Sequence, residues 1–255
     1  MNRWILDVGN TRAKWARFSE GIPHGVPPEQ VDSVSSEDVA TAQNWASSVG
    51  AEDAVMVTGS GPVEVWAAAF PKAWVLRPGD ETPLPTRVVE RQTLGLDRVA
   101  NAFAVMHGCV PQADPQGAWM LVDAGTCVTV DVVQGGMHLG GSISPGVAMR
   151  LESMARGTAR LPRVAPVDQP ISLNLPGALG LKTEEAMVAG AWGGLSAEIL
   201  GKWESLRQEV PNLGLILTGG DAEGLELRDI HPKFADAHLT LKGYHALFTH
   251  THPTL

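Results

Sequence analysis

The sequence predicts an α/β protein with two similar domains that face each other across a cleft. Strand-like apolar runs alternate with helical patterns along the 255 residues, which is the order of α/β folds. Two of these runs end in related tracts, Leu6-Asp7-Val8-Gly9-Asn10-Thr11 and Val122-Asp123-Ala124-Gly125-Thr126. Since both tracts lie between apolar strands, they indicate an internal duplication. Residues 111–117 (PQADPQG) separate the copies, so we expect domains at 1–113 and 114–255.

Composition and charge exclude several classes of protein. The 28 acidic and 19 basic residues give a net charge of −9, which disfavours nonspecific binding to nucleic acids or acidic membranes. Cys109 and Cys127 form no CxxC pair and cannot build a disulfide framework. The apolar start is interrupted at Asp7, and no apolar run reaches the length of a membrane span. We therefore expect a cytoplasmic protein with no nucleic-acid and no membrane partner.

In the first half, apolar runs bounded by turn residues predict strands, and apolar stripes at helical spacing predict helices. The clearest stripe consists of residues 96, 99, 103, 106 and 110. Residues 19–36 contain several prolines and serines, so we expect them to be irregular. The expected strands are 4–8, 13–18, 54–58 and 74–76, and the expected helices are 37–49, 63–70 and 96–110.

The second half is interpreted in the same way. A proline in the first turn favours a helix from Pro145, and Glu184 and Glu185 mark the start of a long helix, where the dipole favours acids. Residues 140–146 and 157–182 are expected to be loops rich in glycine or proline. The expected strands are 119–122, 128–133, 137–139, 213–217 and 238–241, and the expected helices are 145–156, 183–209 and 244–250.

The tract from Asp7 to Lys14 has the residues of a phosphate-binding turn. A hairpin of glycine and small polar residues exposes backbone N–H groups that can cradle phosphate oxygens. A carboxylate at the strand end can hold Mg²⁺ or a metal-bound water beside them. Alone, the tract is also compatible with a plain hairpin. The second copy at 123–126, followed by Thr129 and Asp131, favours phosphoryl chemistry, because two such turns rarely arise by chance.

The start of the striped helix contains a candidate base. Asp97 follows Gly95 and Leu96, and the helix dipole there favours an ionised carboxylate. Such a carboxylate can accept a proton from a substrate hydroxyl, and Arg98 can pair with an anionic substrate. The simpler alternative is a capping aspartate beside a surface arginine.

Three other tracts are ambiguous. Residues 140–146 (GGSISPG) precede a helix and are equally compatible with an anion site and a structural loop. Residues 217–222 (LTGGDA) would let a flat ring approach the backbone, although a helix cap is the simpler interpretation. Near the end, histidines without a neighbouring cysteine or carboxylate favour a solvated tail over a metal site; they are His245, His250 and His252.

Taken together and in this order, the motifs resemble those of type III pantothenate kinases, a family of the acetate and sugar kinase, Hsp70 and actin superfamily. The resemblance covers nearly the whole chain and implies two ribonuclease H-like (actin-like ATPase) domains with a cleft between them. The motifs that carry it are Asp7-Val8-Gly9-Asn10-Thr11 with Lys14, Gly95-Leu96-Asp97-Arg98 with Asn101-Ala102, Asp123-Ala124-Gly125-Thr126 with Thr129 and Asp131, residues 140–146, residues 158–162 (TARLP), Thr183 with Ala186-Met187, and residues 218–222.

The resemblance implies ATP-dependent phosphorylation of pantothenate to 4'-phosphopantothenate, the first step of coenzyme A biosynthesis. It implies ATP binding by Asp7, Val8, Gly9, Asn10, Thr11, Arg12, Ala13, Lys14 and Thr126. It implies pantothenate binding by Gly95, Leu96, Asp97, Arg98 and Thr183, with Asp97 as the proton acceptor. A monovalent cation, K⁺ or NH₄⁺, is implied at Asp123, and Mg²⁺ with ATP is expected near Asp7, directly or through water. A homodimer is implied in which Thr183 reaches pantothenate across the interface.

Two positions depart from the family pattern. Members usually have a tyrosine shortly before the Gly-x-Asp-Arg motif, whereas residues 88–93 contain none, and Lys182 stands where an asparagine is usual. A kinase for another small alcohol or sugar is therefore one alternative. A nucleotide-binding regulator without catalysis is another, although the presence of all three acids, Asp7, Asp97 and Asp123, argues against it.

Overall fold

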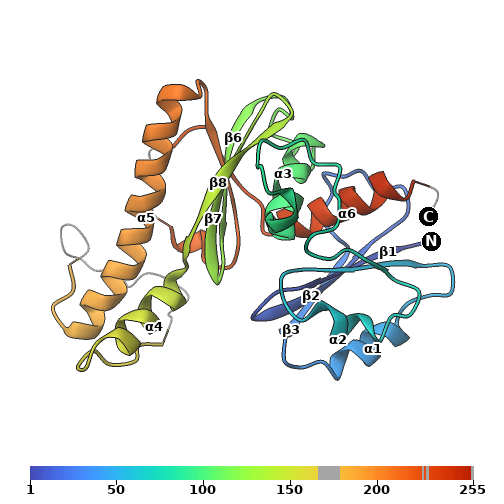
Figure 1. Ribbon diagram of the computed structural model, residues 1–255, viewed down its shortest axis with the longest axis horizontal. Helices are drawn as coiled ribbons and strands as arrows, with labels where there is room; N and C mark the ends of the chain where they lie inside the picture. The colour runs from blue at the N-terminus through green and yellow to red at the C-terminus, as the bar shows by residue number, and fades with distance from the viewer. Residues whose placement is uncertain (166–178, 226, 228–229, 254–255) are drawn as a thin grey trace. The chain divides into compact units, whose positions relative to one another are not determined.

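The computed structural model describes residues 1–165, 179–225, 227 and 230–253, and these form two five-stranded sheets with flanking helices (Figure 1). The chain divides into two compact units. The first comprises Met1–Gly117, Val133–Gly140 and His238–Leu255, and the second comprises Ala118–Val132 and Gly141–Ala237. The first stretch thus ends four residues beyond the expected boundary, and the C-terminal segment groups with the first unit instead of the second.

The sheet of the first unit has the strand order β3-β2-β1-β4-β5. β1 (Arg3–Val8) and β2 (Arg12–Phe18) form an antiparallel hairpin, and β4 (Ala54–Thr58) runs parallel to β1 on its other side. The edge strands are β3 (Gln30–Ser35) and β5 (Trp74–Val75). β3 lies in the stretch that was expected to be irregular. That expectation was wrong because β3 has no buried residue, so no apolar alternation marks a strand that pairing with β2 creates.

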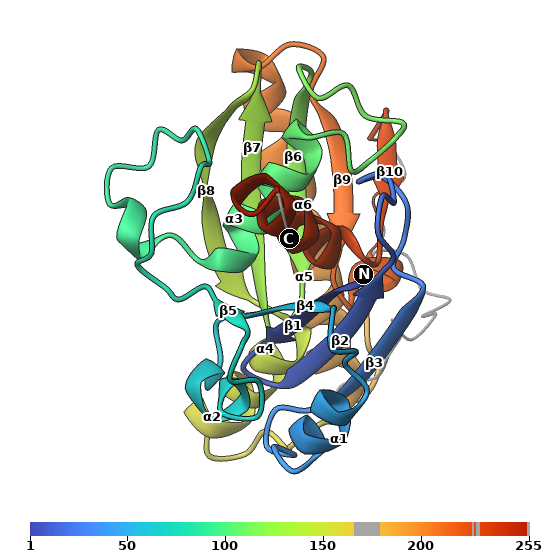
Figure 2. The ribbon, with the colours of Figure 1, turned by 90° about the vertical axis from the view of Figure 1, so that its right-hand side faces the viewer.

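Helices cover both faces of this sheet (Figure 2). On one face, α1 (Thr41–Ser47) and α2 (Val63–Ala67) enclose a core with a row of ring contacts, whose centroids are 4.7, 5.9 and 5.5 Å apart. The rings are those of Trp4, Trp15, Trp45 and Trp66. The other face packs against α6 (Leu239–Thr251), which in turn packs against α3 (Leu96–Met106). This second face is the one that positions the candidate site.

Helix α6 corrects two expectations. Residues 238–241 were expected to be a strand, but a helix begins at Leu239 and every residue from 239 to 248 is buried. An apolar segment buried on all sides lacks the periodicity that separates helix from strand. The expectation of a solvated tail was also wrong for His245. This residue is 3% exposed and stacks on Phe18, with 4.2 Å between the ring centroids. His250 is exposed, and His252 is half-buried.

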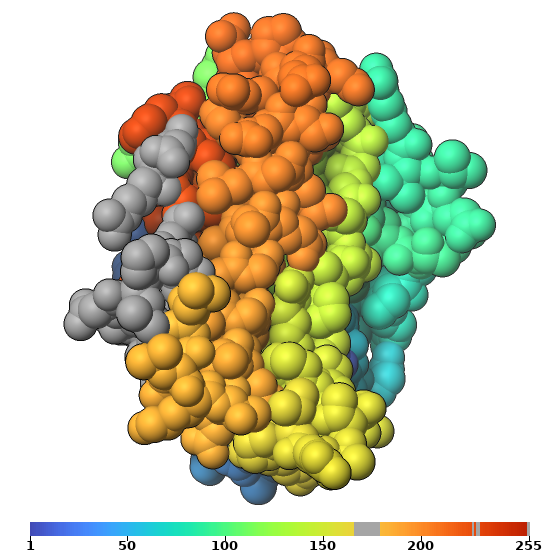
Figure 3. Space-filling view, turned by 90° about the vertical axis from the view of Figure 1, so that its left-hand side faces the viewer, coloured from blue at the N-terminus to red at the C-terminus, as the bar shows by residue number. Residues whose placement is uncertain are grey.

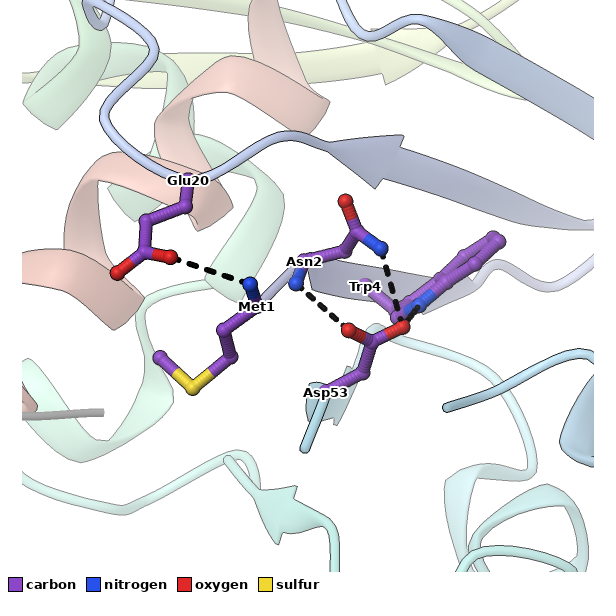
Figure 4. A network of polar contacts seen from close by, with 5 residues as sticks. All are labelled: Met1, Asn2, Trp4, Glu20 and Asp53. Carbon is purple, nitrogen blue, oxygen red and sulfur yellow. Dashed lines mark hydrogen bonds and ion pairs between the residues drawn. The ribbon is translucent and has the colours of Figure 1, made fainter. Parts of the chain in front are cut away.

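One carboxylate ties the start of β1 to the start of β4 (Figure 4). Asp53 accepts hydrogen bonds from the backbone N–H of Asn2 at 2.6 Å, from Trp4 Nε1 at 2.9 Å and from Gly50 N at 3.2 Å. Burial acts to raise the pKa of Asp53, but these hydrogen bonds outweigh it and lower the pKa to about 2. The contact holds the register that places Asp7 beside Thr58 at the far end of the two strands.

The second sheet has the order β10-β9-β6-β7-β8. Its strands are β6 (Ala118–Ala124), β7 (Cys127–Gln134), β8 (Met137–Pro145), β9 (Gly214–Thr218) and β10 (Lys233–Ala235), with β9 parallel to both β6 and β10. Most of the tract 140–146, expected to be a loop, belongs to β8. That expectation was wrong because β8 is an edge strand, where glycine and proline are tolerated.

Helices α4 (Val147–Gly157) and α5 (Thr183–Glu209) lie side by side on the surface of the second unit (Figure 3). Arg150 of α4 forms an ion pair with Glu198 of α5, and its Nε donates to the Pro145 carbonyl at 2.8 Å. The bounds of α5 are those predicted, whereas residues 166–178 of the expected loop lie outside the described residues. Short 3₁₀ turns are present at Arg91–Thr93 and Ala222–Gly224. Among the described helices, none is both long and apolar enough to cross a bilayer.

Candidate active site

The β1–β2 turn has an exposed tip on a buried frame. Gly9 N donates to Arg12 O at 2.9 Å, and the residues between them are exposed. Val8 and Ala13 were predicted to bind ATP, but their side chains lie in the tryptophan core, so only their backbones could contact a ligand. The Arg12 side chain folds back onto β3, where its Nε donates to Ser33 Oγ at 2.8 Å. The turn thus offers mainly backbone groups, as a phosphate cradle does.

Beside this turn, strand register places three polar residues in one row. Asp7 of β1 pairs with Lys14 of β2 and with Thr58 of β4. Since paired residues project from the same face of a sheet, the ammonium, carboxylate and hydroxyl groups share one face. It is the face opposite the tryptophan core, because neighbours along a strand alternate. A hard carboxylate oxygen suits Mg²⁺, and an ammonium suits phosphate.

The loop after β4 packs against the backbone of this turn, a contribution that was not predicted from the sequence. Gly61 N donates to Val8 O at 2.8 Å. A Cβ on Gly59, whose φ is +132°, would lie 2.2 Å from Val8 O, and a Cβ on Gly61 would lie 2.2 Å from Gly9 O. Only glycine permits this approach. The available signal was the likeness of residues 58–61 (TGSG) to residues 218–221 (TGGD).

The β6–β7 turn has the same construction. Gly125 N donates to Cys127 O at 3.1 Å, and Asp221 N donates to Ala124 O at 2.9 Å. Strand β9 places Thr218 beside Asp123, and a Cβ on the following residue, Gly219, would lie 2.3 Å from Ala124 O.

The tract 140–146 also reaches this turn. Gly146 N donates to Thr126 O at 3.1 Å, and a Cβ on Gly146 would lie 2.1 Å from Gly125 O. Three separate tracts of the sequence, 123–126, 140–146 and 217–222, therefore meet in the second unit. Thr126 and Cys127 are exposed at this point, so the turn is accessible to a ligand within its own unit.

The predicted base lies at the first turn of α3 in the first unit. Asp97 Oδ1 accepts a hydrogen bond from the backbone N–H of Arg98 at 2.8 Å. A Cβ on Gly95 would lie 2.5 Å from the same oxygen, so a side chain at this position would displace the carboxylate. Leu96 is 3% exposed, so it anchors the helix rather than contacting substrate with its side chain.

Helix α6 sets the position of this base, and the sequence analysis missed that contribution. A Cβ on Gly243 would lie 2.0 Å from Ala100 O, so α3 and α6 cross at close range. Thr240 Oγ1 also donates to Asn101 Oδ1 at 2.9 Å. The small residue at the crossing could have signalled a helix contact, but the partner helix could not be known from sequence.

The remaining predicted residues are distributed between the units. Asp7, Lys14 and Asp97 belong to the first unit, whereas Asp123, Thr126 and Thr183 belong to the second. Thr183 is the exposed first residue of α5. Among the described residues, no three His, Cys, Asp or Glu side chains form a metal-binding group. The Asp7 carboxylate is a hard oxygen donor, and Mg²⁺ usually takes one or two carboxylates together with phosphate oxygens and water.

Comparison with known proteins agrees with these motifs. Residues 4–205 match the family model described as type III pantothenate kinase. A type III pantothenate kinase from Bacteroides fragilis is 32% identical over 249 residues, covering 96% of this chain and 97% of that protein. One from Porphyromonas gingivalis is 39% identical over 149 residues, 58% of each chain.

Solved structures share the fold at low sequence identity. A putative Baf family transcriptional activator from Campylobacter jejuni has a TM-score of 0.63 at 19% identity, covering 99% of this chain and 100% of that chain. A putative 2-dehydro-3-deoxygalactonokinase from Sinorhizobium meliloti has a TM-score of 0.57 at 13% identity, covering 99% and 98%. These likenesses concern the fold, which is of the predicted actin-like ATPase type. The family model and the curated relatives show that the chain belongs to the type III pantothenate kinase family.

Proposed function

We propose that Asp97 and the two glycine turns carry out the reaction of this family. The chain is a kinase, and the reaction is the phosphorylation of pantothenate in coenzyme A biosynthesis. The supporting observation is the repeated turn: in both units, an aspartate and a threonine are paired in register, and a Thr-Gly loop donates to the turn backbone. We assign the binding of the ATP phosphates to Asp7–Lys14 and Thr126. The proposed location is cytoplasmic, as expected from the sequence.

In this mechanism, the protein mainly positions groups and balances charge, because phosphoryl transfer has a loose transition state. Gly95–Arg98 bind pantothenate, and Asp97 orients its terminal hydroxyl and accepts the proton as the bond to phosphorus forms. The Arg98 N–H donates to Oδ1 and so helps to orient the carboxylate. Lys14 and the turn N–H groups bind phosphate oxygens. Mg²⁺, which Asp7 would hold directly or through water, supplies charge neutralisation on the phosphates.

A monovalent cation, K⁺ or NH₄⁺, is assigned to Asp123. The support for this assignment is that Asp123 is a half-buried carboxylate directly before an exposed turn. Dialysis into sodium alone should therefore abolish most of the activity, and adding back potassium should restore it. Full activity in sodium would reject the assignment.

We further propose a homodimer in which Thr183 contacts pantothenate in the partner subunit. Thr183 is exposed, and the second unit exposes several large apolar side chains: Ile143, Met149, Leu179 and Leu181. Asp97→Asn and Thr183→Ala proteins, each weakly active, should regain activity when mixed and refolded together, because one of the two hybrid sites is then intact. Absence of any recovery would contradict a shared site, and light scattering would report the mass.

The function is tested by ADP release with a panel of acceptors, in potassium and Mg²⁺. Pantothenate should be the preferred acceptor, and mass spectrometry should find 4'-phosphopantothenate. Preference for a sugar or another alcohol would support the alternative that the missing tyrosine and Lys182 suggest. ATP binding without turnover on any acceptor would indicate a regulator.

A further inference from the structure

Thr58 is a buried hydroxyl that the mechanism above does not use. Its side chain is 0% exposed, and its Oγ1 has no hydrogen-bond partner among the residues that the structure describes. A buried hydroxyl without a partner is unfavourable, whereas valine would fill the same volume with the same strand preference. Valine occupies two of the other positions of β4, Val55 and Val57. A buried, unpartnered hydroxyl at this position therefore points to a role other than packing.

The register indicates which group the hydroxyl serves. Thr58 pairs with Asp7 on the neighbouring parallel strand, and paired side chains project from the same face about 4.8 Å apart. Thr58 itself is sealed from solvent, but Asp7 is only half-buried. A ligand therefore cannot contact Thr58 directly in this conformation, whereas Asp7 is partly exposed and lies next to Thr58 on the same face of the sheet.

The neighbouring loop fixes this pair. Directly after Thr58, Gly59 and Gly61 approach the carbonyls of Val8 and Gly9 more closely than any side chain would allow. This packing helps to hold the ends of β1 and β4 together. In the second unit, Thr218 stands beside Asp123 in the same register, and Gly219 follows it. The aspartate–threonine pair thus occurs twice, each time beside a turn that was predicted to bind phosphate.

We propose that Thr58 is a positioning residue for Asp7, to which its hydroxyl donates a hydrogen bond when Mg²⁺ and ATP are bound. This bond would fix the rotamer of Asp7 and leave the other carboxylate oxygen for the hydrated cation. The inference rests on the proposed role of Asp7 at the metal–phosphate site. It predicts that Thr58 contributes to metal affinity but not to the stability of the free protein.

The test compares Thr58→Val with Thr58→Ser in the full chain. Without ligand, the melting temperature of Thr58→Val should be unchanged or higher by about 2–4 °C, because an unpaired hydroxyl is removed. Its Mg²⁺ affinity, from titrations of ATP binding by calorimetry and of kcat, should fall about 10-fold, as for other groups that orient metal ligands. Thr58→Ser retains the hydroxyl and should restore the affinity. Unchanged Mg²⁺ affinity in Thr58→Val, or loss of affinity with loss of stability, would overturn the proposal.

A matched control is Thr86→Val in the same unit. Thr86 is 7% exposed, but its Oγ1 already has two partners, His138 Nδ1 at 2.8 Å and Val88 N at 3.0 Å. Thr86→Val should therefore lower the melting temperature and leave Mg²⁺ affinity unchanged. A fall in Mg²⁺ affinity there as well would show that the readout follows general loosening, and the proposal would fail.

An Asp7→Asn variant separates this inference from the proposed function. If Asp7→Asn does not change Mg²⁺ affinity, the role of Asp7 is wrong, and the inference fails with it. If Asp7→Asn lowers the affinity but Thr58→Val does not, only the inference fails. If Thr58 acts through Asp7, adding Thr58→Val to Asp7→Asn should cause no further loss, whereas additive losses would show an independent role.

Discussion

The β1–β2 and β6–β7 turns share a backbone frame but differ in their braces. In both, the carbonyl of the residue after the aspartate accepts a hydrogen bond, from Gly61 N at 2.8 Å in the first and from Asp221 N at 2.9 Å in the second. The first turn closes between Gly9 and Arg12, whereas the second is one residue tighter. The first is braced by Ser36 Oγ, which donates to Gly9 O at 2.7 Å, and the second by Gly146 N.

This difference shows which part of the turn is constrained. The strand register and the glycine behind each turn are the same because close backbone approach admits no side chain. The tip and its brace differ because exposed loop residues are free to vary. The longer first turn has room for exposed polar residues beside Lys14, whereas the tighter second turn exposes only Thr126 and Cys127 besides its backbone.

The largest expected effect concerns a group that only the first unit supplies. Asp97→Asn should lower kcat by about 10²–10⁴-fold, because it removes the proton acceptor. The melting temperature should hardly change, since an asparagine oxygen can still accept from Arg98 N. Coupled ADP release measures kcat, and thermal unfolding provides the control. Turnover close to that of the unmodified protein would refute the role of Asp97.

A smaller effect is a loss of stability, which should be equal in both units if the two turns are equivalent. Gly59→Ala and Gly219→Ala each place a Cβ within 2.3 Å of a carbonyl oxygen at positive φ. We expect each to cost about 1–2 kcal/mol for the backbone conformation and about 1–3 kcal/mol for overpacking. Denaturant unfolding of the two variants measures these losses.

Gly21→Ala is the matched control for this pair, because Gly21 has a φ of +72° with open space around it. This variant should lose only the part of the free energy of unfolding that comes from the backbone conformation. If either turn variant loses no more than Gly21→Ala, the close approach at that turn does not constrain the protein, and the comparison between the units breaks down.

The smallest expected effect is a pH dependence of the free energy of unfolding, which we attribute to a buried histidine of the first unit. Burial, followed by the nearby charges of His24 and Arg3, lowers the pKa of His245 to about 3 from an ordinary 6.5. Between these values the unfolded chain binds the proton more readily, so stability is complete above about pH 6.5 and falls as the pH drops. The free energy of unfolding should fall by at most about 1.4 kcal/mol for each pH unit. Urea unfolding between pH 7.5 and 5 measures it.

His245→Phe should flatten this profile while keeping the stack on Phe18. The pKa values of His24 and His107 are also lowered, first by burial, and both residues lie in the first unit, so some acid sensitivity should persist in the variant. Parallel pH profiles for the two proteins would show that His245 does not drive the loss.

Most of the candidate site residues were proposed from local sequence. Asp7, Asp97 and Asp123 were proposed because turn chemistry and helix starts depend on neighbouring residues, and α5 was predicted with its observed bounds, with Glu184 and Glu185 in its first turn. The family resemblance was confirmed because ordered motifs along the whole chain carry it. These features all depend on short-range order.

Only the tertiary structure decided which distant segments meet. Strand β3 and the first residues of helix α6, 239–241, were misassigned because their identity comes from partners, β2 in one case and α3 in the other. The role of the loop after Thr58 became apparent only when β4 was seen to lie parallel to β1. Sequence thus determined the local groups that we propose to bind phosphate and accept a proton, while long-range packing, which no short window of residues encodes, decided which of them share a face.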